Sequence, residues 1–443
     1  MLPKSWTFLT QRNLRFFFVS SFLDPVHLPI FFYIIVPYAN EKPNAKKYVC
    51  FLLKCIFLLQ NDPLLKKRSP YLLYIVHAYT MELLAKLAKL VYNRNIERGI
   101  YMSFTFVKHL PIPKEIKEAY PLSEKARAIK EEKDKELANI FRGKDDRFVL
   151  IIGPCSADNE AALLDYVSRL KDVQAKVKDK IFIVPRVYTN KPRTTGKGYK
   201  GMLHQPDPEK GPDLMAGLIA IRKMHMHVIE QTGFITADEM LYPSNHWYMS
   251  DIVSYNAVGA RSVENQEHRL VASGVEGPCG MKNPTSGDFN VMLNSIEAAQ
   301  AEQEFIYRGW EVKTKGNPLT HAILRGGNNK HGNNIPNYHY EDLMRLCDMY
   351  AKRDLENPAC IVDCNHSNSG KQYRQQVRIA REILNSRKYS TDIHKMVKGL
   401  MIESYLVPGN QHIGDGIYGK SITDACLGWD ESEQLIYEIA EAL

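Results

Sequence analysis

Short apolar runs alternate with longer amphipathic stretches from residue 148 to the C-terminus. This alternation predicts parallel strands, each followed by a helix that covers the sheet. Helical stretches of this kind cover residues 213–232 and 370–386, and a charged helix is predicted earlier, over Ser123–Phe141. The eight apolar runs are Phe148–Ser156, Ile181–Tyr188, Phe234–Leu241, Ala257–Ser262, Cys279–Asn283, His321–Gly327, Ala359–His366 and Val397–Leu406.

Each apolar run ends close to a side chain that can bind a ligand or react. These side chains are Cys155, Arg186, Glu239, Arg261, Lys282, Arg325, His366 and Glu403. A closed barrel would bring all eight ends to one face, whereas the outer strands of an open doubly wound sheet lie too far apart to share a site. We therefore predict a (β/α)8 (TIM) barrel over residues 148–443, preceded by a helical extension over 102–147. Residues 304–315 (EFIYRGWEVKTK) alternate like a small β-hairpin inserted before the sixth strand.

Residues 1–101 do not follow this pattern. Their apolar stretches, 28–38 and 48–59, are 11 and 12 residues long, and a membrane-spanning helix needs roughly 20. No small-residue cleavage site follows a single apolar core, so a signal peptide fits poorly. We leave this leader unassigned and expect Met102 to be the natural start, with residues 1–101 as translated upstream sequence. A membrane-associated leader is the alternative.

The excess of basic charge is concentrated in the leader. The chain has 58 Lys and Arg against 50 Asp and Glu, and residues 1–101 hold 14 and 5 of them. The remaining 44 basic and 45 acidic residues nearly balance, which gives no electrostatic reason to expect nucleic-acid binding. The eight cysteines form no CxxC pair, and a chain of this length does not need disulfides, so we expect a cytoplasmic protein.

Six residues at or just after the predicted strand ends are cationic. They are Arg186, Lys191, Arg193, Arg261, Lys282 and Arg325. Cations gathered in one pocket repel one another unless an anion lies among them, and guanidinium groups match phosphate and carboxylate. Any one of these arginines, taken alone, is more simply explained as a surface ion pair. Six at converging strand ends indicate a ligand with several anionic groups.

A second group of residues combines soft and hard metal donors. Cys155, His366 and Glu403 lie at strand ends, and Asp424 follows the last strand. Thiolate, imidazole and carboxylate together suit a borderline divalent ion such as Mn2+, Fe2+, Co2+ or Zn2+ better than Mg2+. These residues lie far apart in the sequence, so spacing alone leaves a core cysteine and a buried histidine as an equal alternative.

Two loops that follow predicted strands contain residue types that bind phosphate. Residues 191–198 (KPRTTGKG) combine Lys, Arg and Thr donors with glycines that let the backbone approach a ligand closely. Residues 419–424 (GKSITD) follow the last strand. We predict that the GKS triplet in this second loop does not belong to a nucleotide-binding P-loop.

The motifs at these positions form a recognisable set. They are IGPCS (152–156), PRVYTNKPRTT (185–195), GAR (259–261), KNPTSG (282–287), ILRGG (323–327), DCNHSNSGKQ (363–372), ESYLVPGNQ (403–411) and YGKSITDACLGW (418–429). In order and spacing, residues 105–443 resemble the microbial class I 3-deoxy-D-arabino-heptulosonate 7-phosphate (DAHP) synthases, also called phospho-2-dehydro-3-deoxyheptonate aldolases. The motifs are highly specific as a set, and residues 1–101 have no counterpart in the family.

The resemblance implies a metal-dependent transferase of the shikimate pathway to aromatic amino acids. Such an enzyme condenses phosphoenolpyruvate with D-erythrose 4-phosphate and water, giving DAHP and phosphate. The implied metal ligands are Cys155, His366, Glu403 and Asp424. The implied phosphoenolpyruvate contacts are Arg186, Lys191, Glu239, Arg261, Lys282 and Arg325. The implied erythrose 4-phosphate contacts are Lys191, Pro192, Arg193 and Thr194. We expect a homo-oligomer and an aromatic amino-acid effector.

Within this reaction, Lys191, Glu239 and Lys282 are the candidates for catalytic proton transfer. Lys191 could protonate the new alkoxide, and either Glu239 or Lys282 could position the attacking water. Two departures from the family pattern affect the second substrate and the effector. Residues 196–199 (GKGY) replace a common Val-Gly-Trp stretch, and the predicted hairpin, where the family tends to bind its effector, is short.

Two other functions fit these residues less well. The related 3-deoxy-D-manno-octulosonate 8-phosphate synthase, which uses arabinose 5-phosphate, is shorter and usually lacks the KPRTT motif. A non-catalytic, membrane-tethered barrel would be expected to lose metal or cationic residues, yet all ten metal and phosphoenolpyruvate positions are occupied.

Overall fold

The chain folds as two units in its computed structural model, Met1–His109 and Leu110–Leu443. The structure describes residues 10–11, 14–19, 32–35 and 104–443. The first unit contains three short antiparallel strands, β1 (Thr10–Gln11), β2 (Leu14–Val19) and β3 (Phe32–Ile35). Most of the predicted leader lies outside the described residues, so its origin as translated upstream sequence stays a prediction.

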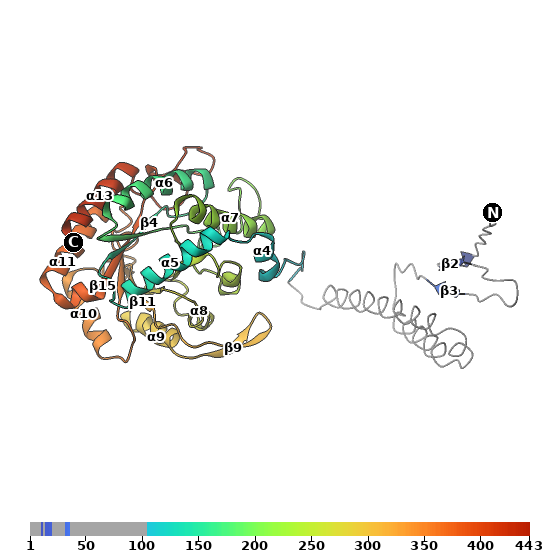
Figure 1. The fold of residues 1–443 in the computed structure, drawn as a ribbon, viewed down its shortest axis with the longest axis horizontal. Coiled ribbons are helices and arrows are strands. Elements are labelled where there is room, and N and C mark those ends of the chain that lie inside the picture. The colour runs from blue at the N-terminus through green and yellow to red at the C-terminus, as the bar shows by residue number, and fades with distance from the viewer. Residues whose placement is uncertain (1–9, 12–13, 20–31, 36–103) are drawn as a thin grey trace. The chain divides into compact units, whose positions relative to one another are not determined.

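The second unit is built around eight parallel strands with helices outside them (Figure 1). The strands are β4 (Phe148–Gly153), β5 (Ile181–Pro185), β6 (Thr236–Glu239), β7 (Val253–Val258), β8 (Cys279–Lys282), β11 (Thr320–Leu324), β14 (Cys360–Asp363) and β15 (Val397–Glu403). Their hydrogen-bonded order is β5-β4-β15-β14-β11-β8-β7-β6, and a bridge between Arg186 and Ala237 joins the two ends. The predicted (β/α)8 barrel is confirmed.

The strands are buried on both faces, which explains why they read as continuous apolar runs. In β4, Val149 and Ile151 belong to the cluster inside the barrel, whereas Leu150 and Ile152 belong to the cluster that includes the surrounding helices. This alternation is the pleat of a strand, in which successive side chains point to opposite faces. The barrel interior is therefore a packed core, and ligands can reach only its ends.

Helices connect most of the strands and cover the outside of the barrel (Figure 1). They are α6 (Glu160–Val177), α7 (Leu214–Thr232), η1 (Pro243–Tyr248, a 3-10 helix), α8 (Gln266–Ala272), α9 (Phe289–Gln300), α10 (Tyr340–Ala351), α11 (Gln375–Tyr389), α12 (Thr391–Met396) and α13 (Trp429–Ala442). Asn159, Asp213, Asn265 and Asp288 accept hydrogen bonds from first-turn N–H groups, as preferred N-cap residues do.

The predicted N-terminal extension contains α4 (Pro113–Ala119) and α5 (Glu124–Phe141), and α5 is capped by the Ser123 hydroxyl. The C-terminal end of α5 packs against residues of the barrel interior. The ring of Phe141 lies 4.3 Å from that of His321, which is near the start of β11. Helix α5 therefore closes the N-terminal end of the barrel, opposite the end where the candidate site residues lie.

Two predicted elements have different bounds in the structure. The fourth strand covers Val253–Val258, four residues before the predicted start, because the buried polar residues Ser254 and Asn256 interrupt the apolar pattern. The helix predicted over 370–386 begins only at Gln375. Gly370 and Lys371 both have positive φ, at 59° and 63°, which a right-handed helix does not allow.

The predicted hairpin is present as β9 (Glu304–Tyr307) and β10 (Trp310–Lys313). Its two turn residues, Arg308 and Gly309, have φ values of 53° and 79°, as a type I′ turn requires. Two further short strand pairs follow β11 and β15. They are β12 (Gly327–Asn328) with β13 (Asn334–Ile335), and β16 (Val407–Asn410) with β17 (Lys420–Ser421).

The GKS triplet lies between β16 and α13. Residues 414–421 (GDGIYGKS) do have the GxxxxGKS spacing of a P-loop, so spacing alone does not exclude one. A P-loop joins a strand directly to a helix, whereas this segment leads into β17, and α13 begins only at Trp429. The topology therefore argues against a nucleotide site here. Among the described residues, no helix is both long enough and apolar enough to cross a membrane.

Candidate active site

Three predicted metal ligands come together at the C-terminal end of the barrel. Cys155 follows β4, Glu403 ends β15 and Asp424 follows β17. One donor atom of each lies within 4.8 Å of the others; Cys155 and Glu403 are buried and Asp424 is exposed. Strands β4 and β15 are neighbours, with Gly153 opposite Glu403, so the barrel register itself sets this approach.

Hydrogen bonds fix the segment that carries Asp424 against the segment that carries Cys155. The Cys155 N–H donates to Cys426 Sγ at 3.4 Å. The hydroxyls of Ser156 and Thr423 are 2.9 Å apart. These contacts flank Asp424 on both sides in the sequence. They hold its carboxylate near the thiol although the two residues are 269 positions apart.

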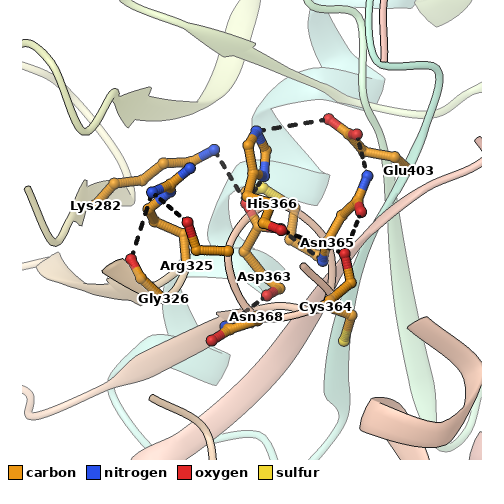
Figure 2. Close-up of polar contacts among 12 residues, drawn as sticks. Lys282, Arg325, Gly326, Asp363, Cys364, Asn365, His366, Asn368 and Glu403 are labelled. Atoms are coloured by element: carbon orange, nitrogen blue, oxygen red, sulfur yellow. Dashed lines mark hydrogen bonds and ion pairs between the residues drawn. The ribbon is translucent and has the colours of Figure 1, made fainter. Parts of the chain in front are cut away.

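The fourth predicted ligand, His366, lies beside this cluster (Figure 2). Its Nε2 is 4.0 Å from Glu403 Oε1, and its Nδ1 is 2.9 Å from Asp363 Oδ2. The backbone of His366 has φ 53°, which is uncommon for a residue with a side chain. Burial raises the pKa of Asp363, but the nearby His366 and Lys282 outweigh that effect and hold its pKa well below the usual range. Asp363 is therefore a carboxylate that lies beside the imidazole, a neighbour that metal-binding histidines commonly have.

Buried polar groups hold Glu403 in place. Arg186 NH2 donates to Glu403 Oε1 at 3.1 Å, and Asn365 Nδ2 donates to Oε2 at 2.6 Å. Burial alone would raise the pKa of Glu403, but His366, Arg186 and Lys191 keep it below its usual value. Glu403 is thus an anion in a buried position, a form that can bind a cation.

Lys191 adjoins the same cluster. Its Nζ donates to Cys155 Sγ at 3.1 Å. Burial raises the pKa of the Cys155 thiol to about 11, with Glu403 adding to the rise and Lys191 opposing it. Metal binding requires the thiolate, and a cation at this position would favour that form. Thiol, carboxylates and imidazole therefore fit a divalent metal ion.

The predicted cationic residues at the strand ends face the same end of the barrel. Lys282 Nζ donates to Asp363 Oδ2 at 3.1 Å (Figure 2). Arg325 NH1 donates to Ser367 Oγ at 3.2 Å. Burial lowers the pKa of Arg325, and the nearby charge of Arg261 lowers it further. Arg261 itself is exposed. Two arginines that repel each other at the barrel mouth are suited to an anion placed between them.

The KPRTT segment forms a loop that folds back on itself. Lys191 N donates to Lys200 O at 3.1 Å, and Arg193 Nε donates to Tyr199 O at 2.7 Å. Gly201 has φ 96°, and a Cβ there would lie 2.4 Å from Thr189 O, so a glycine is needed to close the loop. Pro192 is half-buried and Thr194 is exposed. The loop thus holds Lys191 inward beside Cys155 while Thr194 faces solvent.

Glu239 is buried at the end of β6, close to the next strand. A Cβ on Gly259 would lie 2.4 Å from Glu239 Oε1. The carboxylate of Glu239 therefore occupies space that only a glycine leaves open at position 259. This glycine begins the GAR motif, in which Arg261 follows two residues later.

Sequence reasoning missed several residues that hold the site together. Asp363, Asn365 and Ser367 contact Lys282, Glu403 and Arg325 respectively. All three lie in the DCNHSNSGKQ motif, and a buried acid directly after an apolar strand was the available signal for Asp363. The contacts of Asn365 and Ser367 depend on the turn after β14, which residue spacing alone does not predict.

The chain is similar to known proteins of one family. The sequence profile of the DAHP synthetase I family matches residues 120–436. A phospho-2-dehydro-3-deoxyheptonate aldolase of Haemophilus influenzae is 39% identical over 338 residues, which are 74% of this chain and 89% of that protein. The Tyr-sensitive enzyme of the same name from Escherichia coli is 36% identical over 343 residues, 75% of this chain and 93% of that protein.

A solved structure is similar as well. It is a phospho-2-dehydro-3-deoxyheptonate aldolase from Francisella tularensis, with a TM-score of 0.71 and 33% identity. The match covers 77% of this chain and 98% of that one. Together with the profile match, these similarities show that the chain belongs to the DAHP synthetase I family.

Proposed function

We propose that this protein condenses phosphoenolpyruvate with D-erythrose 4-phosphate and water, giving DAHP and inorganic phosphate as the first step towards aromatic amino acids. The observation that carries the proposal is the meeting of two groups at one barrel end. A cluster of thiol and carboxylate donors lies beside a set of cationic side chains, with Lys191 reaching Cys155 at 3.1 Å. Family membership supports this reaction, and the arrangement of the two groups indicates where in the barrel it would occur.

The cationic residues would hold phosphoenolpyruvate. Its phosphate and carboxylate both match guanidinium and ammonium groups, so we assign them to Arg186, Arg261, Lys282 and Arg325. Lys191, Pro192, Arg193 and Thr194 would hold erythrose 4-phosphate, because their loop begins beside the donor cluster and extends to solvent. Binding both substrates at one barrel end would bring the enol carbon near the aldehyde.

Cys155, His366, Glu403 and Asp424 would hold a divalent ion, for which Mn2+, Fe2+, Co2+ or Zn2+ suit a set that includes thiolate. Such an ion, when bound, would supply Lewis acidity towards the aldehyde oxygen. The support in the structure is the cluster of Cys155, Glu403 and Asp424, with His366 Nε2 4.0 Å from Glu403 Oε1.

The remaining chemistry is proton transfer, which we assign to three residues. The reaction forms a bond between C3 of phosphoenolpyruvate and the aldehyde carbon. Water adds to C2, and cleavage of the C2–O bond releases phosphate. Lys191, whose Nζ lies 3.1 Å from Cys155 Sγ, would give a proton to the new alkoxide. Lys282 Nζ donates to Asp363 Oδ2 at 3.1 Å, and Glu239 is buried at the end of β6. Either residue could therefore position the water.

We also propose how the protein is regulated, how it assembles and where it is located. Relatives are named Tyr-, Phe- and Trp-sensitive, which supports an aromatic amino-acid effector for this chain. The hairpin exposes Ile306 and Trp310, and such apolar surface suits contact with a second copy. The six cysteines of the described region are unpaired, in keeping with a cytoplasmic enzyme.

The experiment that tests the function is phosphate release by the full chain with phosphoenolpyruvate and either aldose phosphate, after addition of Mn2+. Erythrose 4-phosphate should support much faster release than arabinose 5-phosphate. A preference for arabinose 5-phosphate would move the protein to the related octulosonate synthases. No release with either aldose, from folded protein supplied in turn with each of the four metals, would contradict the proposal.

A further inference from the structure

The barrel has a seam between β5 and β6. These strands lie at the two ends of the hydrogen-bonded order. The backbone joins them through the bridge between Arg186 and Ala237 and through a hydrogen bond from Val187 N to Ala237 O, at 2.8 Å. Elsewhere in the barrel, neighbouring strands pair over at least three consecutive residues. The chain after β5 is the one that continues into the loop of Lys191.

One carboxylate spans this seam. Asp238 Oδ1 accepts from the Thr189 N–H at 3.0 Å and from the Glu239 N–H at 2.7 Å. Its Oδ2 accepts from the Thr189 hydroxyl at 2.5 Å. Asp238 is 7% exposed, and the hydrogen bonds that a buried carboxylate accepts from N–H and O–H donors are among the stronger ones in proteins. Side-chain bonds thus join β6 to the chain beyond β5, where the backbone ladder is short.

His225 of helix α7 also contacts the Asp238 carboxylate. His225 is fully buried, with its Nε2 3.4 Å from Asp238 Oδ2 and its Nδ1 2.7 Å from Thr236 Oγ1. A neutral imidazole with its proton on Nε2 satisfies both contacts, by donating to the carboxylate and accepting from the threonine. Asp238 therefore has a fixed position relative to both β6 and the helix that covers it.

The residues on either side of this contact belong to the proposed catalytic set. Thr189 lies two residues before Lys191, whose Nζ is 3.1 Å from Cys155 Sγ. Glu239 directly follows Asp238 and presents its own N–H to the same carboxylate oxygen. A single side chain thus sets the distance between a group that would donate a proton and a group that would position water.

We propose that Asp238 is a positioning residue, which holds Lys191 and Glu239 at their working separation across the β5–β6 seam. This inference rests on the proposed function for the roles of those two residues. Asp238 acts through its hydrogen bonds to Thr189 and Glu239 and takes no part in proton transfer. Misplacing a reacting group by about 1 Å can cost on the order of a hundredfold in rate. Loss of the Asp238 hydrogen bonds across the seam should therefore lower kcat.

The test compares two substitutions at one position. Asp238→Asn keeps Oδ1 as the acceptor for both N–H groups, so its kcat should stay within roughly threefold of wild type. Asp238→Ala removes every side-chain bond across the seam and should lower kcat by on the order of ten- to a hundredfold. Asp179→Ala, which removes an exposed carboxylate just before β5, is the matched control and should match wild type. Rates are measured per folded molecule, well below the melting temperature of each variant.

A purely structural role would give a different result. In that case Asp238→Ala would melt earlier but keep the wild-type kcat and KM while folded, and the proposal would be overturned. Equal losses for the Asn and Ala variants would also overturn it, because the hydrogen-bond acceptor would then not matter. If the Ala variant does not fold, Asp238→Leu decides. It removes both carboxylate oxygens but keeps a side chain of similar shape, and a kcat equal to wild type in the folded variant would contradict the proposal.

A crystal structure of Asp238→Ala, or of Asp238→Leu if the former does not fold, separates this inference from the proposed function. We expect Lys191 Nζ to move away from Cys155 Sγ, relative to a wild-type crystal structure. If Lys191 and Glu239 keep their wild-type positions, the positioning role is wrong even if the enzyme makes DAHP. If they move but wild-type protein turns over neither aldose, the proposed function fails and the structural role of Asp238 stands.

Discussion

Two pairs of charged side chains in the site are buried. Arg186 and Glu403 are each 1% exposed and 3.1 Å apart, and Lys282 pairs with Asp363 at 3.1 Å. Removing charges from water is costly, and such pairs often contribute little net stability. Their presence is better explained by what they orient. Arg186 holds Glu403, the carboxylate proposed to bind a metal, and Asp363 holds Lys282 and lies beside His366.

The thiol of Cys155 is the residue-scale feature that most restricts the choice of metal. Chelation should abolish activity, and Mn2+ or a neighbouring first-row ion should restore it. Cys155→Ser should weaken metal binding by on the order of a hundredfold or more, because a hydroxyl is a poor substitute for thiolate. Titration of metal-free protein by calorimetry measures this directly. Unchanged affinity in the serine variant, or full activity after exhaustive metal removal, would rule out the proposed site.

The two substrates should depend on different arginines. Loss of one charge-assisted contact costs about 1.5–3 kcal/mol, roughly ten- to a hundredfold in binding. Arg325→Ala should therefore raise KM mainly for phosphoenolpyruvate, and Arg193→Ala mainly for erythrose 4-phosphate. Steady-state kinetics with each substrate varied in turn provides the measurement.

Arg127→Ala, which truncates an exposed arginine of α5, is the control for both variants. Thermal melts are needed as well, because Arg193 also donates to Tyr199 O within its own loop. If both variants remain folded and weaken the two substrates equally, the division of the cations into two pockets is wrong.

Candidate residues could be identified from the sequence where a side chain able to bind or react directly follows a predicted strand. A cation or acid directly after an apolar run is visible, and all eight such residues lie at one end of the observed barrel. Asp238 could not be found this way, because it lies inside a run and acts through the backbone of Thr189. Nor could the 3.1 Å approach of Lys191 to Cys155, which depends on the shape of a loop.

Among the helices and strands, α5 gives the barrel its closed end. Phe141 is 2% exposed and packs among the interior residues. Phe141→Ala should lower the free energy of unfolding by about 3–5 kcal/mol, because it leaves a cavity. KM for both substrates should be unchanged while the protein is folded, since the site is at the opposite end. Lys135→Ala, exposed on the same helix, should melt like wild type.

Chemical denaturation and steady-state kinetics together check this prediction. A loss of catalytic activity in folded Phe141→Ala protein would contradict the prediction, because it would show that packing at the closed end of the barrel affects the site at the other end. The prediction of α5 itself succeeded because a serine cap and a long charged stretch are local signals. The bounds of β7 were missed because buried polar residues are tolerated only through tertiary contacts.

At the scale of the whole molecule, every candidate site residue belongs to the unit Leu110–Leu443. Protein that starts at Met102 should therefore fold and have the same kcat and KM as the full chain. Parallel purification and assay of the two proteins measures this. If the shorter protein is insoluble or inactive while the full chain works, residues 1–101 are needed, and the expectation that they are translated upstream sequence is wrong.

The central claim is a condensation in which phosphoenolpyruvate loses phosphate by cleavage of its C2–O bond. The most direct test uses phosphoenolpyruvate with oxygen-18 in the bridging position, incubated with metal-loaded full-length protein and erythrose 4-phosphate. The proposed reaction predicts that released phosphate keeps the label and that release requires the aldose. Unlabelled phosphate would indicate hydrolysis at phosphorus, and release that proceeds equally without the aldose would indicate hydrolysis of phosphoenolpyruvate alone. Either result would contradict the assigned function.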